Sequence, residues 1–189
     1  SEMCIRDRTG AMRSSNEIGS DGLYNFISSI RVASSSDAND KGVMVVFNDE
    51  IHTARNVTKT HTSNINTFQS PNQGPLGILT KDNVQFYNQP YKQQSFKIIN
   101  YQLKVPLIKA YMGMESDIFN FYAQQNVDGI VIEALGQGNL PPSCLKGVQT
   151  CLDNNIPIVL VSRSFNGIVS PVYAYEGGGF QLANKGLIF

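Results

Sequence analysis

The sequence predicts an α/β fold made of two parallel-sheet domains of the Rossmann-like or flavodoxin-like kind. Three observations predict it. A helical pattern precedes a buried strand near the N-terminus, residues 105–161 alternate between strand and helix patterns, and a polar stretch separates the two regions. Of the 189 residues, 41% are hydrophobic and 16% are charged, which is typical of a folded globular protein.

Charge and hydropathy exclude two classes of partner. The 15 basic residues are balanced by 15 acidic ones, so no net charge steers the chain toward nucleic acid or an anionic membrane. No apolar run approaches the roughly 20 residues that a membrane-spanning helix needs. We therefore expect neither nucleic acid nor membrane as a partner.

The N-terminal region is expected to contain one helix followed by short strands. Residues 21–33 form an amphipathic pattern, because Leu23, Phe26, Ile27, Ile30 and Ala33 recur at helical spacing, and Ser20 or Asp21 would cap the helix. Residues 34–41 are a polar loop, and the apolar run 43–47 predicts a strand buried on both faces. Further on, residues 81–83 are expected to turn between strands 77–79 and 84–87.

The C-terminal region alternates strands and helices with short connections. Strands are expected at 105–111, 129–132 and 158–161, and helices at 115–125 and 142–152. Because consecutive strands joined by a helix run parallel, the order βαβαβ predicts a parallel sheet, with ligands beyond the carboxyl ends of its strands. The polar tract before it, residues 91–104, is interpreted as a linker between the domains.

Three motifs argue against a dinucleotide cofactor, a metal site and a disulfide bond. The turn Gly136-Gln137-Gly138-Asn139 opens like a dinucleotide-binding loop, but Pro141 stands where the third glycine is required, which leaves a tight strand-to-helix turn. His52 and His61 lack a further metal ligand nearby, so we expect no metal site. Cys144 and Cys151 lie seven residues apart on an expected helix, about 10 Å along its axis and too far for a disulfide.

A lysine lies among hydroxyl side chains in the stretch Arg55-Asn56-Val57-Thr58-Lys59-Thr60-His61-Thr62. If burial among such groups desolvates its amine, Lys59 can be neutral near pH 7 and act as a general base. Local chemistry alone favours the alternative, a solvated face of a strand.

Several segments, taken in order, resemble the bacterial type II L-asparaginases of the asparaginase/glutaminase family, amidohydrolases that convert asparagine into aspartate and ammonia. They are GAMR at 10–13, SDGLYNF at 20–26, GVMVVFND at 42–49, RNVTKTHT at 55–62, GPLG at 74–77, DGIVIEALGQGNL at 128–140 and SRSFNGIV at 162–169. The resemblance covers residues 9–189. It implies acyl transfer through a threonine acyl-enzyme, no cofactor, and a homotetramer of dimers with active sites at the dimer interface.

The resemblance also implies roles for particular residues. Lys59 matches the catalytic lysine, which belongs to a threonine–lysine–aspartate group, and Ala11 in GAMR lies beside the substrate side-chain amide. Asn139 reaches the active site of a neighbouring subunit. Glu176, or Tyr175 in its place, binds the substrate α-amino group across the dimer. Thr58 and Thr60 are expected to orient Lys59 and not to act as nucleophiles.

The family's nucleophilic threonine, in a TGGTI-type motif, and its threonine–aspartate pair do not appear in this sequence. We therefore expect residues 9–90 to be the C-terminal half of an N-terminal domain and residues 105–189 a C-terminal domain truncated at its end. Residues 1–8 are interpreted as a sequencing or cloning artefact. By itself the chain is expected to be inactive and poorly soluble.

Alternatives remain open at this point. L-Asparagine is the expected substrate, but a glutaminase-asparaginase of the same fold would use the same residues on L-glutamine, and a non-enzymatic small-ligand-binding α/β module is a third possibility. A type II protein is expected to be periplasmic or secreted, with the cytoplasm as the alternative.

Overall fold

The computed structural model describes residues 6–91, 97 and 100–189, and of residues 6 and 7 it describes the backbone alone. It divides into two compact units, Ser1–Phe96 and Lys97–Phe189. The boundary falls inside residues 91–104, the expected linker, of which 92–96 and 98–99 lie outside the described residues. Each unit is treated separately below.

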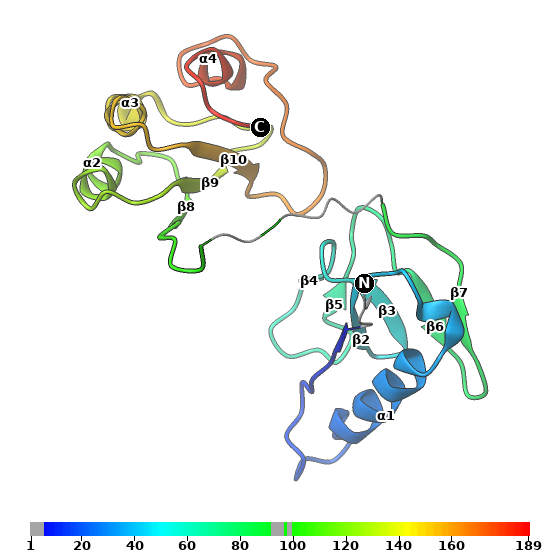
Figure 1. The fold of residues 1–189 in the computed structure, drawn as a ribbon. Coiled ribbons are helices and arrows are strands. Elements are labelled where there is room, and N and C mark those ends of the chain that lie inside the picture. Colours follow the sequence, from blue (N-terminus) through cyan, green and yellow to red (C-terminus); the bar gives the residue numbers. More distant parts are fainter. Residues whose placement is uncertain (1–5, 92–96, 98–99) are drawn as a thin grey trace. The chain divides into compact units, whose positions relative to one another are not determined.

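Unit 1 contains one long helix and a mixed sheet (Figure 1). Its elements are β1 (Arg6–Arg8), α1 (Gly22–Ala33), η1 (Ser36–Ala38), β2 (Val43–Phe47), β3 (Glu50–Thr53), β4 (Thr58–Lys59), β5 (Phe68–Gln69), β6 (Gly77–Leu79) and β7 (Val84–Phe86). Five strands form a sheet in the order β1-β2-β3-β6-β7, while β4 and β5 form a separate two-stranded ladder. The strand β1 lies within residues 1–8, the segment interpreted above as an artefact, and pairs with β2.

The α/β class is confirmed, but the sheet of unit 1 is not the parallel sheet that we expected. Only β1 and β2 pair in parallel, and the pairs β2–β3, β3–β6 and β6–β7 are antiparallel. The reason lies at Asn48 and Asp49, whose φ angles of 49° and 64° form a two-residue turn. A strand that returns through so short a turn can pair with its predecessor only in antiparallel fashion.

Helix α1 packs on β1 and β2 with its polar side inward. The residues buried on it are Asn25, Ser28, Ser29 and Val32. The apolar residues that predicted the helix point outward, since Leu23, Phe26, Ile27 and Ile30 are 49% to 73% exposed. The helix is therefore present where expected, but the face that it buries is the opposite one.

Unit 2 has the expected parallel sheet. Its elements are β8 (Leu107–Lys109), α2 (Asp117–Gln124), β9 (Ile130–Ala134), η2 (Pro142–Cys144), α3 (Leu145–Asp153), β10 (Ile158–Ser162) and α4 (Gly179–Asn184). The strands run in the order β10-β9-β8. In Figure 1, α2 and α3 lie side by side next to this sheet. They share one core with the sheet residues Ile132 and Leu160.

Helices α2 and α3 approach closely at Gly147. A Cβ atom at this position would lie 2.6 Å from the Ser116 carbonyl oxygen and 2.8 Å from Phe119 Cβ, so only glycine fits without movement. The free cysteines Cys144 and Cys151 are buried in the same core. The Cys151 thiol donates to the Phe119 carbonyl oxygen, 3.3 Å away, and burial raises the pKa of the Cys144 thiol to about 11.

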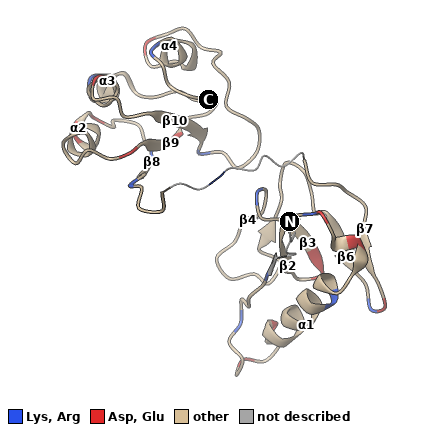
Figure 2. Ribbon diagram, viewed as in Figure 1, with Lys and Arg blue, Asp and Glu red and all other residues tan. Residues whose placement is uncertain are grey.

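None of the described helices has the length and apolar character needed to cross a bilayer. Basic and acidic residues are both spread over the two units in Figure 2. This distribution agrees with the balanced charge of the sequence.

The close approach at Gly147 leads to a stability prediction. Gly147→Ala should lower the free energy of unfolding of unit 2 by about 1–3 kcal/mol, because the added methyl group forces α2 and α3 apart. Urea denaturation followed by circular dichroism measures the effect. The matched control is Gly129→Ala, whose Cβ would make ordinary contacts of 3.5 Å with Pro157. Equal stability of the two variants would contradict the prediction.

Candidate active site

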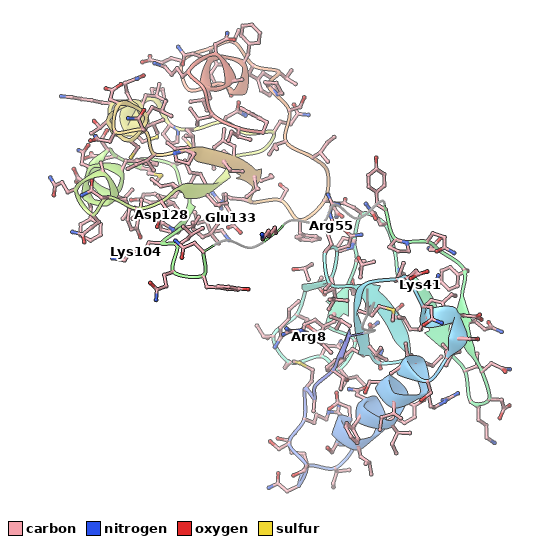
Figure 3. All side chains as sticks on the ribbon, in the orientation of Figure 1. Arg8, Lys41, Arg55, Lys104, Asp128 and Glu133 are labelled. Atoms are coloured by element: carbon pink, nitrogen blue, oxygen red, sulfur yellow. The ribbon has the colours of Figure 1, made fainter. Side chains whose placement is uncertain are left out.

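A cavity of about 300 Å³ in unit 1 brings together two of the expected site residues. Its walls come from the end of β1 and the loop after it, and from strands β2, β4 and β5. They are formed by Arg8, Thr9, Gly10, Ala11, Met12, Val45, Phe47, Lys59 and Phe68. Arg8, at the end of β1, is labelled in Figure 3. Ala11 and Lys59, which are distant in the sequence, thus line one cavity.

The loop that carries Ala11 is held by a carboxylate at the start of α1. Asp21 accepts hydrogen bonds from the backbone N–H groups of Met12, at 3.1 Å, and Arg13, at 3.0 Å. Burial acts to raise the pKa of Asp21, but the N–H groups of Arg13, Met12 and Asp21 itself, with the Asn25 amide, outweigh it and lower the pKa. The carboxylate thus fixes the backbone on the C-terminal side of Ala11.

Asn25 fixes the same loop on its N-terminal side. Its side chain is 1% exposed. The Nδ2 atom donates to the Gly10 carbonyl oxygen at 3.0 Å and to Asp21 Oδ2 at 3.1 Å, and the Oδ1 atom accepts from the Asn48 N–H at 3.1 Å. One buried amide therefore links the Ala11 loop to the turn between β2 and β3.

The position of Lys59 comes from the backbone of the β4–β5 ladder. Lys59 pairs with Phe68, and the Thr60 N–H donates to the Thr67 carbonyl oxygen at 2.8 Å. The Thr60 hydroxyl donates to that same carbonyl, at 3.0 Å, and not to the lysine. The Lys59 side chain is exposed where it lines the cavity. The Thr60 hydroxyl therefore bonds to the loop after β4, and the expected role of Thr60 in orienting Lys59 stays a prediction.

Aromatic side chains form part of the cavity wall. The ring of Phe47, at the end of β2, lies 4.8 Å from that of Phe68 on β5, centroid to centroid. This contact is also the apolar link between the main sheet and the ladder that carries Lys59. Sequence reasoning had assigned no role to either phenylalanine.

The two histidines have separate surroundings. His61 Nδ1 accepts from the N–H groups of Ser63, at 3.1 Å, and Asn64, at 3.0 Å, which closes the loop after β4. His52 is fully buried on β3, with Nδ1 3.0 Å from Ser70 Oγ. Among the residues that the structure describes, no three His, Cys, Asp or Glu side chains gather as a metal site would require.

Asn139 and Glu176 both lie in unit 2, on two loops that bond to each other. Asn139 Oδ1 accepts from the Gly179 N–H at 3.1 Å, and Asn139 Nδ2 donates to the Leu135 carbonyl oxygen at 3.3 Å. The Leu140 N–H donates to the Gly177 carbonyl oxygen at 2.8 Å. Glu176 and Tyr175 are exposed at the bend of the second loop.

The glycine run beside Glu176 differs from the flexible surface loop that three glycines usually indicate. Gly177, Gly178 and Gly179 are buried, and a Cβ at position 177 would overlap the Leu140 carbonyl oxygen. Gly177 also has a φ of 82°, which glycine adopts without strain. The run therefore allows close packing against the Asn139 turn and leads into α4, a helix that the sequence reasoning did not predict.

Two family models match the chain. The model described as "Asparaginase, N-terminal" matches residues 8–92, and that of the "Glutaminase/Asparaginase C-terminal domain" matches residues 104–189. Together they account for both units.

Relatives of the chain include an L-asparaginase from Bacillus licheniformis, 31% identical over 180 residues, and a probable L-asparaginase from Deinococcus radiodurans, 34% identical over 184 residues. Each alignment covers 95% of this chain and 56% of the relative. A glutamyl-tRNA(Gln) amidotransferase component from Methanococcus maripaludis is 32% identical over 195 residues, which cover 95% of this chain and 45% of that protein. The chain thus spans about half the length of the curated relatives it matches.

The lowered pKa of Asp21 predicts a pH dependence of stability. Its folded-state pKa lies below the ordinary 3.8, so the stability it contributes is present above that value and is lost as the pH falls through the folded pKa. Asp21→Asn should therefore be less stable than the wild type at pH 7, with the difference shrinking below about pH 4. Urea midpoints of unit 1 between about pH 7 and pH 2.5 measure it.

The matched control is Asp37→Asn, which changes an exposed carboxylate on η1 and should leave the pH profile of stability unaltered. A difference between Asp21→Asn and wild type that stays constant across the whole acid range would show that Asp21 does not clamp the loop through its charge.

Proposed function

The chain belongs to the asparaginase family, and on that premise we propose that the protein is an L-asparagine amidohydrolase. It would convert asparagine and water into aspartate and ammonia. One observation carries the proposal: Ala11 and Lys59, the positions matched to the substrate-amide contact and the catalytic lysine, line the same cavity. Its volume of about 300 Å³ is at the small end of ligand pockets and suits an amino acid.

The proposed chemistry is acyl transfer through a threonine ester. A threonine hydroxyl attacks the side-chain amide carbon of asparagine, and Lys59 acts as the general base that takes the hydroxyl proton. The C–N bond then breaks, and nitrogen leaves as ammonia after it receives a proton. Water hydrolyses the ester to release aspartate. None of these steps requires a metal or an organic cofactor.

The loop at Ala11 would serve this reaction by its rigidity. Its backbone is held by Asp21 and Asn25 on both sides of Ala11. Fixed backbone groups beside the reacting amide lose little energy in reorganisation as charge develops on the carbonyl oxygen. The Thr60 hydroxyl donates a hydrogen bond to the Thr67 carbonyl oxygen, which supports the inference that Thr60 is not the nucleophile.

We further propose that the nucleophilic threonine lies in a TGGTI-type motif, which this sequence does not contain, and that the 189-residue chain alone does not hydrolyse asparagine. A base without its nucleophile forms no acyl-enzyme. The type II class, the homotetramer and a periplasmic or secreted location belong to the same proposal.

Glutamine is the second candidate substrate. The relatives named as glutamyl-tRNA(Gln) amidotransferase components favour it, as does the description of the C-terminal family model. Both amides would meet the same groups, so relative values of kcat/KM on asparagine and glutamine separate the two activities.

The decisive test is ammonia release by the protein expressed from its complete gene, with Lys59→Met in parallel. Loss of the general base should lower kcat by about 10²–10⁴-fold. Lys81→Met, which changes an exposed lysine between β6 and β7, should keep wild-type activity. A wild-type protein that binds asparagine but releases no ammonia would instead be the non-enzymatic ligand-binding module.

Sharing of active sites between protomers is tested by mixing two inactive variants. If Asn139 completes a neighbouring site, Lys59→Met and Asn139→Ala chains, unfolded and refolded together, should form some sites with neither defect and regain activity. Each variant refolded alone is the control. No gain on mixing would contradict the cross-subunit role and leave Asn139 as a residue that holds its own loop.

A further inference from the structure

We propose that His52 is a positioning residue for Lys59, because its buried side chain fixes the strand against which the lysine is paired. This inference rests on the proposed function and extends it to a residue that lines no wall of the cavity. It depends on a hydrogen bond between two buried side chains and on the pairing of two short strands.

The imidazole of His52 sits inside unit 1 with little freedom. It is 0% exposed, and its Nδ1 atom lies 3.0 Å from the hydroxyl oxygen of Ser70, which is itself 5% exposed. On the other side, Nε2 lies 3.3 Å from Glu50 Oε2 but forms no hydrogen bond to any described residue. Burial lowers the pKa of His52 and so favours the neutral ring, while a hydrogen bond to the Phe68 backbone acts in the opposite direction.

A neutral imidazole carries one N–H donor and one acceptor nitrogen. Nε2 faces the Glu50 carboxyl, whose pKa is raised by burial. Nδ1 and the Ser70 hydroxyl form one hydrogen bond, whose direction follows the tautomer of the ring. The ring thereby spans β3 and the residue that directly follows β5.

The β4–β5 ladder is short. It contains two residue pairs, Thr58 with Gln69 and Lys59 with Phe68, and lies outside the five-stranded sheet. A pair of such short strands is marginally stable by itself. Two contacts anchor β5 to the main sheet. One is the contact between the rings of Phe47 and Phe68, and the other is the hydrogen bond between Ser70 and His52. Fixing β5 fixes Lys59 across the ladder.

The same three side chains, Ser70, His52 and Glu50, are of the types found in serine hydrolase triads. The burial of Ser70 argues against that role, because a nucleophile that is 5% exposed meets no substrate. The simpler alternative is a core histidine that contributes to overall stability without any preference for the ladder. The experiment below separates this alternative from positioning.

The first measurement is amide hydrogen exchange in the protein expressed from its complete gene. His52→Leu keeps the volume of the side chain but removes the hydrogen-bond partner of Ser70. It should speed exchange of the Thr60 amide, which bonds across the ladder loop, at least about tenfold, while the Leu79 amide in β6 changes less than about twofold. Equal acceleration at both amides, or none at Thr60, would overturn the proposal.

The second measurement is the kinetics of ammonia release. His52→Leu should lower kcat by about tenfold to a hundredfold, because small displacements of a catalytic group are costly, and change KM by less than about twofold. His52→Asn places an amide where Nδ1 lies and should restore kcat to within about threefold of wild type. Ser70→Ala should reproduce the loss, and the double variant should lose no more than either single one.

Wild-type kcat in His52→Leu, together with faster exchange at Thr60, would also overturn the role in positioning Lys59. If the wild-type protein releases no ammonia at all, it is the proposed function that fails. In that case the exchange data alone decide whether His52 holds the ladder.

Discussion

The polar clamp formed by Asp21 and Asn25 is the constraint on which the rest of unit 1 depends. Between them these two side chains bond to the Gly10 carbonyl and to the N–H groups of Met12, Arg13 and Asn48. Each of those backbone groups would otherwise need another partner or carry a desolvation cost of about 1–3 kcal/mol. Helix α1 must therefore turn these residues toward the sheet, which fixes its rotation. The loop after β1 and the turn between β2 and β3 are held in consequence.

The rotation of α1 explains why its apolar residues lie outside. Spacing alone indicates which residues share a face of a helix, and burial of the apolar face is the usual result. Here the opposite face carries a buried amide whose hydrogen bonds are satisfied, so burying it costs little. The exposed stripe of Leu23, Phe26, Ile27 and Ile30 supports the expectation of poor solubility, which remains a prediction.

In unit 2 the elements from β8 to β10 lie close to where the sequence predicts them. Each strand there is an apolar run between helical patterns, so local signals agree with the topology. In unit 1 the sequence predicts the sheet less well, because nothing in Asn48 and Asp49 alone indicates that both adopt positive φ angles and close a hairpin. In the site, Lys59 and Ala11 were identified through family resemblance, since a lysine among threonines is common on solvated strands. Asp21 was recognised only as a helix cap. Its carboxylate also bonds the backbone of residues 12 and 13. This contact depends on the tertiary structure, so no local sequence pattern predicts it.

In both units a side-chain amide holds a loop that carries an expected site residue. A functional loop must present a backbone or a side chain in one position, yet loops have few packing contacts to hold them. In unit 1 the amide of Asn25 and the carboxylate of Asp21 bond the Ala11 loop, and in unit 2 the amide of Asn139 bonds the backbone on both sides of its turn. Both ends of the Asn139 amide are engaged within its own unit. Because an amide nitrogen has two N–H donors and its oxygen two lone pairs, each end of Asn139 could still bond a substrate while its turn stays in place, and Glu176 is exposed as well.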